Sequence, residues 1–137
     1  MILLYALYLK VDESNIETVR KSGGPYLLNV WSSFCQNSMN FKPTWDAATN
    51  ALQKIDGLTI GDVECTANPQ ACHSLVEPGY PKVLFLEPRL NIMQIFNGNR
   101  TISNLRQFAL EMLEYPFTSR NGGCTSNIAT PSDPILR

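Results

Sequence analysis

Two kinds of hydrophobic pattern alternate along most of this chain. Continuous apolar runs of roughly four to eight residues are typical of strands buried on both faces, whereas apolar positions three and four apart are typical of helices packed on one side. The runs predict strands at 4–11, 25–31, 58–65, 82–86 and 91–96. The spaced positions and their capping residues predict helices at about 14–22, 35–54, 68–75 and 101–113.

The order of these elements restricts the topology of the sheet. The first three strands alternate with helices, which requires right-handed crossovers and therefore parallel strands at the centre. The last two strands are joined only by residues 87–90, and so short a link implies an antiparallel hairpin. The sequence therefore predicts an α/β fold with a mixed central β-sheet flanked by helices, in the order βαβαβα-ββα.

Composition and charge narrow the class of protein. The 137 residues are 44 % apolar and 17 % charged, which suits one globular domain with a core. Eleven Lys and Arg residues and twelve Asp and Glu residues give a formal net charge of −1, so the chain lacks the broad positive field that attracts nucleic acid. No apolar run reaches the roughly 18 residues of a membrane span. The single histidine, His73, follows Cys72, but no other close pair of Cys or His residues completes a set of zinc ligands. We therefore expect no metal site.

The two ends of the chain differ in character from its middle. Residues 115–137 are rich in Pro, Gly, Ser and Thr, which predicts a flexible tail or linker after a domain at 1–114. The apolar start is interpreted as a buried first strand, because it lacks the positive charge and the small-residue cleavage site of a secretory signal. The alternative is the end of such a signal. On the first interpretation we expect one domain of a longer protein.

Cys35 is the first candidate for chemistry. It lies in a stretch without any charged residue, 22–41, where the second predicted strand ends and a helix begins. Open α/β sheets place their sites at such strand ends. The unpaired N–H groups and the dipole of the helix N-terminus stabilise a thiolate there, and a thiolate can attack a disulfide. The alternative is an inert buried cysteine.

Five short motifs carry a resemblance to a known family. They are WSSFCQNS (31–38) where the family has FYAPWCGHC, Pro43 with Trp45 in the following helix, VECTANP (63–69) for VDCTANP, GYP (79–81), and FNGNRT (96–101) for YNGxRT. In this order and register, the chain from about 10 to 113 resembles the thioredoxin-fold domains of the protein disulfide isomerase family. The resemblance implies the thioredoxin fold, with Cys35 as the reactive thiol.

Four departures from the family pattern bear on function. Ser38 replaces the second active-site cysteine and gives C-x-x-S, and its hydroxyl can donate a hydrogen bond to the Cys35 sulfur. Asn29 replaces the buried acid that accepts a proton from that second cysteine, and Pro78 replaces the arginine that tunes it. Asn37 replaces the active-site histidine. Three of these changes concern the missing thiol, which favours a domain specialised as a monothiol.

The resemblance also implies a client-binding surface around Cys35. The proline of GYP is cis in the family, so Pro81 would face Cys35 and present the backbone of Tyr80 to an extended client as an added strand. Trp31 and Phe34 would line the same surface. The alternative for Pro81 is a tight turn before a central strand.

The remaining cysteines and a sequon point to a cellular compartment. Six residues separate Cys65 from Cys72, a spacing that some modules of the family bridge, so the resemblance implies a structural disulfide worth roughly 2.5 kcal/mol. Two free buried thiols are the alternative. Such a bond implies an oxidising compartment, the endoplasmic reticulum lumen or secretory pathway. A glycosylation sequon at Asn99 is compatible with it. Three interpretations remain for Cys124 in the tail: it pairs with another chain, it folds back to cover Cys35, or it has no role.

We expect a monothiol disulfide-isomerase-like domain that forms mixed disulfides with client proteins through Cys35. The mixed disulfide would persist until another thiol, such as glutathione, resolves it. The expected partners are clients with free or disulfide-bonded cysteines and neighbouring domains of a longer chain; we expect no nucleic acid and no cofactor. One alternative is a redox-inert binding or chaperone module. A monothiol glutaredoxin is disfavoured, because its glycine pair and its basic residue before the cysteine are absent.

Overall fold

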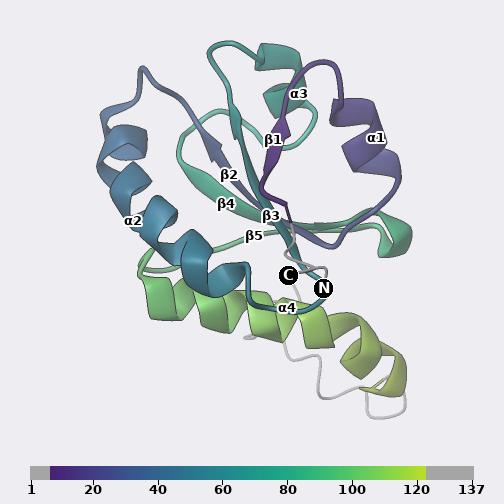
Figure 1. Cartoon of the computed structure of the whole chain (residues 1–137). Helices are drawn as coiled ribbons and strands as arrows, with labels where there is room; N and C mark the ends of the chain where they lie inside the picture. Colours follow the sequence, from purple (N-terminus) through teal and green to yellow (C-terminus); the bar gives the residue numbers. More distant parts are fainter. Residues whose placement is uncertain (1–6, 123–137) are drawn as a thin grey trace, which may run out of the picture.

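The computed structural model describes residues 7–122 and contains the predicted strands and helices in the predicted order (Figure 1). These are β1 (Leu9–Val11), α1 (Ile16–Lys21), β2 (Tyr26–Trp31), α2 (Gln36–Leu52), β3 (Thr59–Glu64), α3 (Pro69–His73), β4 (Lys82–Glu87), a 3-10 turn η1 (Pro88–Leu90), β5 (Ile92–Ile95) and α4 (Ile102–Gly122). The first residues of the predicted first strand, 4–6, and the segment 123–137 with Cys124 lie outside the described residues.

The strands form a single mixed sheet in the order β1-β3-β2-β4-β5. β3 pairs in parallel with β1 and β2, while β4 pairs antiparallel with β2 and β5. Helices α1 and α3 contribute to the core on one face of the sheet, and α2 and α4 to the core on the other (Figure 1). The prediction of a thioredoxin fold with a mixed central sheet is confirmed.

The central strand β2 is buried on both faces. Leu28 and Val30 pack into the core beneath α1 and α3, whereas Leu27 packs into the core beneath α2 and α4. All three side chains are completely buried. Because alternate side chains of a strand point to opposite faces, a strand covered on both sides needs an uninterrupted apolar run. This is why the run at 25–31 is continuous rather than alternating.

Helix α2 begins directly after Cys35 and is the element that positions this thiol. It continues through Pro43 and buries one side against the sheet and α4. The buried residues on that side include Phe41, Trp45, Ala48 and Leu52. Trp45 and Leu52 are almost completely inaccessible, so the helix has a fixed place on the sheet. Its N-terminus is thereby held at the carboxyl end of β2.

Two details of the fold differ from the sequence prediction: the conformation of one link and the end of the last helix. The link between β4 and β5 contains the turn η1, because the buried carboxylate of Glu87 accepts hydrogen bonds from the backbone N–H (3.1 Å) and the guanidinium (2.6 Å) of Arg89. The backbone of α4 stays helical to Gly122, past residue 114 where composition placed the start of the tail. In the described part of the chain, no helix combines the length and apolar character needed to cross a bilayer.

A disulfide joins Cys65, which follows β3, to Cys72 in α3, with a Cα–Cα distance of 5.6 Å. Both side chains are buried in the core beneath α1 and α3. α3 is only five residues long, and so short a helix is unstable by itself. The disulfide therefore helps to keep α3 against the end of β3.

We predict that this disulfide is present in the isolated protein without any client. In denaturant without reductant, an alkylating agent should label Cys35 and leave Cys65 and Cys72 unmodified, as peptide mass spectrometry would show. Replacing Cys65 and Cys72 together by Ala should lower the free energy of unfolding by about 2.5 kcal/mol, because the unfolded chain without the cross-link gains conformational entropy. Cys35→Ala is the matched control and should change stability little. Labelling of both positions 65 and 72 would contradict the prediction.

Candidate functional site

Cys35 is the N-cap residue of α2 and follows a tight turn after β2. Its backbone N–H donates to the carbonyl of Ser32 (3.0 Å), and the N–H of Phe34 donates to the Ser32 hydroxyl (3.2 Å). The Cys35 side chain is partly exposed and has no disulfide partner among the described cysteines. Unpaired N–H groups at a helix N-terminus favour a thiolate. The position therefore suits a thiol that meets another protein.

Ser38 lies one turn into α2 and is completely buried. Its hydroxyl oxygen accepts a hydrogen bond from the backbone N–H of Ser32 (3.1 Å), so it fastens the helix to the turn before Cys35. Among the hydrogen bonds of the described residues there is none from Ser38 to the Cys35 sulfur. The Ser38 hydroxyl hydrogen stays available, because that bond uses only its oxygen. The role of Ser38 that the structure shows is therefore to hold the turn before Cys35 against α2.

Glu64, the last residue of β3, ties the same loop to the sheet. Its carboxylate accepts hydrogen bonds from the backbone N–H groups of Ser33 (2.9 Å), Thr66 (3.0 Å) and Ala67 (2.9 Å). Desolvation favours the neutral acid, but these bonds and one from the Thr66 side chain outweigh it and lower the pKa of Glu64 to about 2. The carboxylate is therefore ionised at neutral pH and holds the turn before Cys35.

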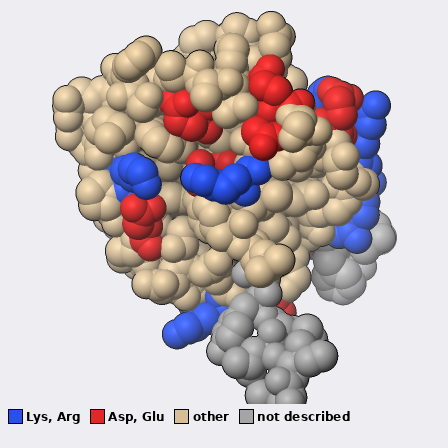
Figure 2. Space-filling view, turned by 45° about the horizontal axis from the view of Figure 1, so that its top comes forward, with Lys and Arg blue, Asp and Glu red and all other residues tan. Residues whose placement is uncertain are grey.

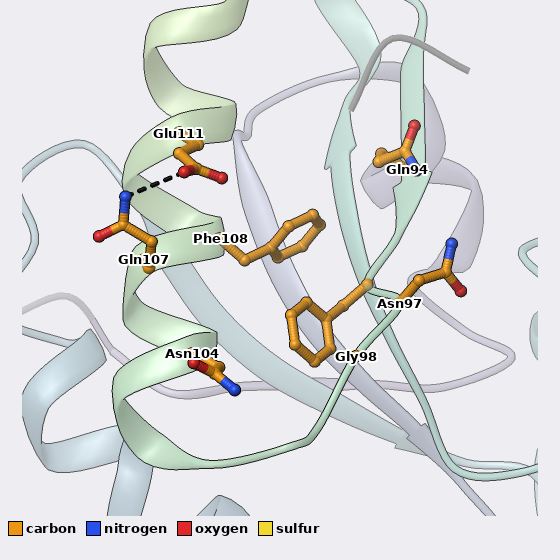
Figure 3. A pocket seen from close by; sticks show the side chains of 8 residues that line it. Gln94, Asn97, Gly98, Asn104, Gln107, Phe108 and Glu111 are labelled. Carbon is orange, nitrogen blue, oxygen red and sulfur yellow. Dashed lines mark hydrogen bonds between the residues drawn. The ribbon is translucent and has the colours of Figure 1, made fainter. Parts of the chain in front are cut away.

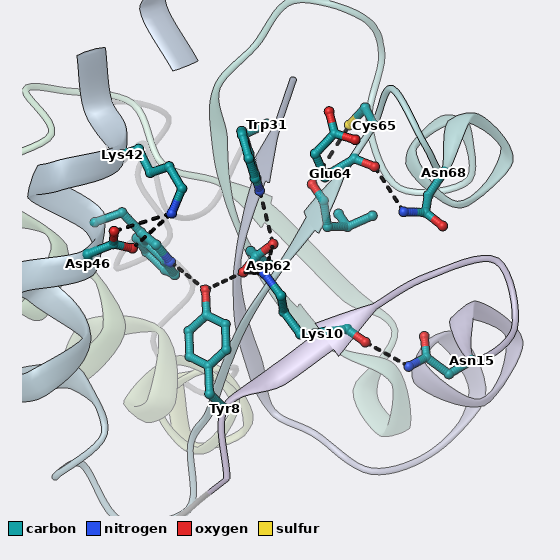
Figure 4. Close-up of polar contacts among 12 residues, drawn as sticks. Tyr8, Lys10, Asn15, Trp31, Lys42, Asp46, Asp62, Glu64, Cys65 and Asn68 are labelled. Carbon is teal, nitrogen blue, oxygen red and sulfur yellow. Dashed lines mark hydrogen bonds and ion pairs between the residues drawn. The ribbon is translucent and has the colours of Figure 1, made fainter. Parts of the chain in front are cut away.

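A second carboxylate, Asp62 on β3, is buried in a polar network (Figure 4). It accepts hydrogen bonds from the Tyr8 hydroxyl (2.6 Å), the Trp31 indole (2.9 Å) and the Lys10 ammonium (3.0 Å), and the Trp45 indole donates to the Tyr8 oxygen (2.8 Å). Burial and the bond to Asp62 raise the pKa of Tyr8 well above its usual range. The network connects β1, β2, β3 and α2, and it fixes Trp31 just before the Cys35 loop.

Asn29 lies beside Asp62 on the neighbouring strand, since the two residues pair in the β2–β3 register. It is 1 % exposed, and its Oδ1 atom has no hydrogen-bond partner in the described structure. A carboxylate at position 29 would lie next to the Asp62 carboxylate, and two buried like charges repel. A neutral amide at this position avoids that repulsion. Sequence analysis missed Asp62, although a charged residue inside an apolar strand run is a usable signal.

The strand register brings the predicted client-binding residues to one edge of the sheet. Val30 pairs with Lys82 on β4, so Trp31 at the end of β2 lies level with Pro81. The Tyr80–Pro81 peptide bond is cis, and Tyr80 is partly exposed. The Lys82 ammonium donates to the carbonyl of Glu77 (2.6 Å) and so holds the loop before Pro81.

Other predicted site residues lie apart from that edge or beside it. Phe34 precedes Cys35 and is 85 % exposed, which leaves an aromatic ring open next to the thiol. Cys65 and Cys72 are buried beneath α1 and α3 and play no direct part at Cys35. Asn99 is exposed in the loop between β5 and α4. Within the described residues, no group of three His, Cys, Asp or Glu could hold a metal.

Charged side chains on the face shown in Figure 2 are interspersed. Lys and Arg lie beside Asp and Glu, and most of this face is uncharged. Among the described residues, ion pairs join Lys42 to Asp46 (3.2 Å) and Lys10 to Asp62 (3.0 Å). A face of this kind offers neutral surface to a partner rather than a field of one sign.

Comparison with known proteins agrees with the fold. The thioredoxin family model matches residues 7–111. The J-Trx1 fragment of ERdj5 superposes with a TM-score of 0.70 at 20 % identity, covering 78 % of this chain and 52 % of that one. The zinc-bound form of human ERp44 superposes with a TM-score of 0.65 at 15 % identity, covering 77 % of this chain and 31 % of that one.

Curated relatives point the same way. A thioredoxin domain-containing protein 5 homolog of Drosophila melanogaster is 26 % identical over 115 residues, which are 82 % of this chain and 27 % of that protein. The protein disulfide-isomerase-like protein EhSep2 of Emiliania huxleyi is 26 % identical over 94 residues, 68 % of this chain and 42 % of that protein. The chain thus spans less than half the length of these relatives. It belongs to the thioredoxin family, and its relatives are protein disulfide isomerase-like.

Proposed function

We propose that this domain forms mixed disulfides with client proteins through Cys35 and acts in thiol-disulfide exchange, isomerisation or thiol-mediated retention during protein folding. The observation that carries the proposal is the placement of Cys35. It is a partly exposed N-cap thiol, and the residue three positions on, Ser38, is a buried hydroxyl that shapes the loop. Cys35 has the position of a reactive cysteine without a thiol partner in its own helix.

The chemistry follows from this single thiol. The Cys35 thiolate attacks a client disulfide, one new S–S bond forms, and the second client sulfur leaves as a thiolate. Ser38 has no sulfur with which to displace the client, so the mixed disulfide persists. A thiolate from glutathione or from the client then attacks it and releases Cys35. This sequence favours isomerisation and retention over net oxidation or reduction.

The site surroundings support a fixed loop. Glu64 and Ser38 both bind the backbone of the turn before Cys35, and Asp62 holds Trp31 at its start. Exposed Phe34 and the loop at Pro81 form the client-facing edge. A fixed loop keeps Cys35 at the N-terminus of α2, next to that edge.

We further propose that the domain works in the endoplasmic reticulum lumen or another part of the secretory pathway. The buried disulfide and the disulfide isomerase-like relatives support this location. We also propose that the domain is one unit of a longer chain, which would supply further client-binding domains.

The first prediction from this proposal concerns how the mixed disulfide at Cys35 is released. With an oxidised client peptide and no other thiol, a covalent complex should accumulate at Cys35, and added glutathione should release it, because the domain has no resolving thiol. Acid quenching followed by intact mass spectrometry measures the complex. Cys35→Ala is the control and should form none. Rapid multiple-turnover reduction of insulin by this domain would contradict the proposal, and no complex at all would favour a redox-inert binding module.

The second prediction concerns the residues around the missing thiol. Ser38→Cys should form a 35–38 disulfide readily yet reduce insulin poorly, because Asn29 cannot accept a proton from the new thiol. Adding Asn29→Glu should raise the rate roughly a hundredfold through general-base catalysis. The neighbouring Asp62 should disfavour ionisation of the new acid, so the gain should grow with rising pH.

Asn29→Gln in the Ser38→Cys background is the matched control, and folded protein should be confirmed by circular dichroism. A Ser38→Cys variant that equals a dithiol family member in insulin reduction would show that the surrounding substitutions do not matter.

The third prediction concerns the Glu64 carboxylate. Its pKa in the folded protein, about 2, lies below the ordinary 4.5, so it stabilises the fold above pH 4.5 and loses this effect as pH falls toward 2. Glu64→Gln should lower the free energy of unfolding at pH 7 by roughly 1 kcal/mol, because solvent screens the partly exposed group. Denaturant titrations from pH 7 to 2 should show the difference from wild type shrinking. Glu17→Gln is the exposed control. If the difference in free energy of unfolding between wild type and Glu64→Gln were as large at pH 2 as at pH 7, the low pKa assigned to Glu64 would be contradicted.

A further inference from the structure

A groove runs along the first turns of α4 beside the end of β5 (Figure 3). Its floor is aromatic, with the Phe96 and Phe108 rings packed edge to face at 5.2 Å. Its rim consists of amide side chains, those of Gln94, Asn97, Asn104 and Gln107. The lining includes none of the residues placed around Cys35. Phe96, Asn97 and Gly98 belong to the FNGNRT motif, whereas sequence analysis assigned no role to the other lining residues.

The groove adjoins the sequon at Asn99. Asn99 is exposed and follows directly after the loop residues that line the groove. Its backbone carbonyl accepts hydrogen bonds from the side-chain amide of Asn104 (3.0 Å) and from the N–H of Thr101 (2.9 Å). Asn104 itself lies on the groove rim, so the backbone of Asn99 lies beside that rim.

The chemistry of the groove suits a neutral sugar. Aromatic faces pack against the C–H faces of a saccharide, while amide side chains donate to and accept from hydroxyl and acetamido groups. The carboxylate that lines the groove, Glu111, already accepts a hydrogen bond from Gln107 (2.9 Å). A lining without Lys or Arg gives no reason to bind an anion.

We propose that Asn99 carries an N-linked glycan and that its first sugars lie in this groove. The modification forms an N-glycosidic bond between Asn99 Nδ2 and the sugar C1 of a lipid-pyrophosphate-linked oligosaccharide. The C1–O bond to the pyrophosphate breaks, and the lipid pyrophosphate leaves together with the amide proton. The inference goes beyond the exchange function and rests only on the secretory location proposed above.

The direction of the groove gives the glycan a place away from the thiol. Phe96 donates its N–H to Val83 on β4, so the loop that carries Asn99 leaves the sheet at the same edge as Pro81. Asn104, Gln107 and Glu111 occupy successive turns on one side of α4 and lead away from that edge. A glycan seated along them leaves the Cys35 loop accessible to clients.

The test is to direct the full chain into the secretory pathway of eukaryotic cells with a removable leader. Asn99→Gln removes the acceptor but keeps the backbone carbonyl that Asn104 binds. Thr101→Ala is unsuitable, because the Thr101 hydroxyl also caps α4 by accepting from the N–H of Asn104 (3.1 Å). Gln107→Ala alters the groove, and Arg106→Ala, exposed on the same helix outside the groove, is the matched control.

Intact mass should show a glycan on the wild-type chain and none on Asn99→Gln. The melting temperature of the glycosylated chain should exceed that of Asn99→Gln by about 3 °C or more, because the seated sugar contacts only the folded state. Gln107→Ala should remove at least half of this difference, and Arg106→Ala should keep it.

An unmodified Asn99, a glycan without any melting shift, or an equal shift in Gln107→Ala and wild type would each overturn the inference. So would a loss of client-peptide capture caused by Gln107→Ala in unglycosylated protein, since the groove would then belong to the client. The alkylation rate of Cys35, measured on the same samples, reports separately on the exchange function.

Discussion

Strand β2 is hydrogen-bonded along both edges and covered by helices on both faces, and this double burial fixes where Cys35 lies. Parallel pairing with β3 and antiparallel pairing with β4 set its register at every residue. Its carboxyl end therefore meets the loop at Pro81 and the start of α2 at one edge of the sheet. Slipping β2 by one residue would turn Leu28 and Val30 toward the wrong core, so the position of the thiol is as well determined as the core itself.

Buried polar groups next to β2 then give this site its own character. Asp62 is satisfied by three donors, and it stands beside a neutral Asn29. Glu64 takes three backbone N–H groups and stays ionised, so the Cys35 turn is held by a charge rather than by packing. These groups hold the loop and its neighbouring tryptophan in place. Asn29, which stands where the family has its buried acid, carries no carboxylate to accept a proton from a thiol at position 38, and this is consistent with a serine there.

The hydrophobic pattern was sufficient to predict the order of the elements. Each core strand needs a continuous run of apolar residues, and each helix needs apolar residues three and four positions apart on its buried side. The end of α4 was not predicted, because Pro116 and the Asn-Gly-Gly at 121–123 are residues that usually end a helix, whereas the backbone stays helical to Gly122. The Asp62 network was equally hidden. Tyr8, Trp45 and Asp62 are far apart in the sequence, and only the folded sheet brings them together. The bond from Ser32 to Ser38 was missed because a hydroxyl is compatible with many partners.

The central claim is that Cys35 is a reactive thiol held by a preformed loop. The most direct measurement is its alkylation rate at pH 7 in the native protein, compared with that of the same residues in an unfolded peptide, with the site mapped by peptide mass spectrometry. A partly exposed thiol presented by this preformed loop should react at least about tenfold faster than the peptide thiol. A rate equal to or below that of the peptide would contradict this account and would identify the domain as a binding module without thiol chemistry.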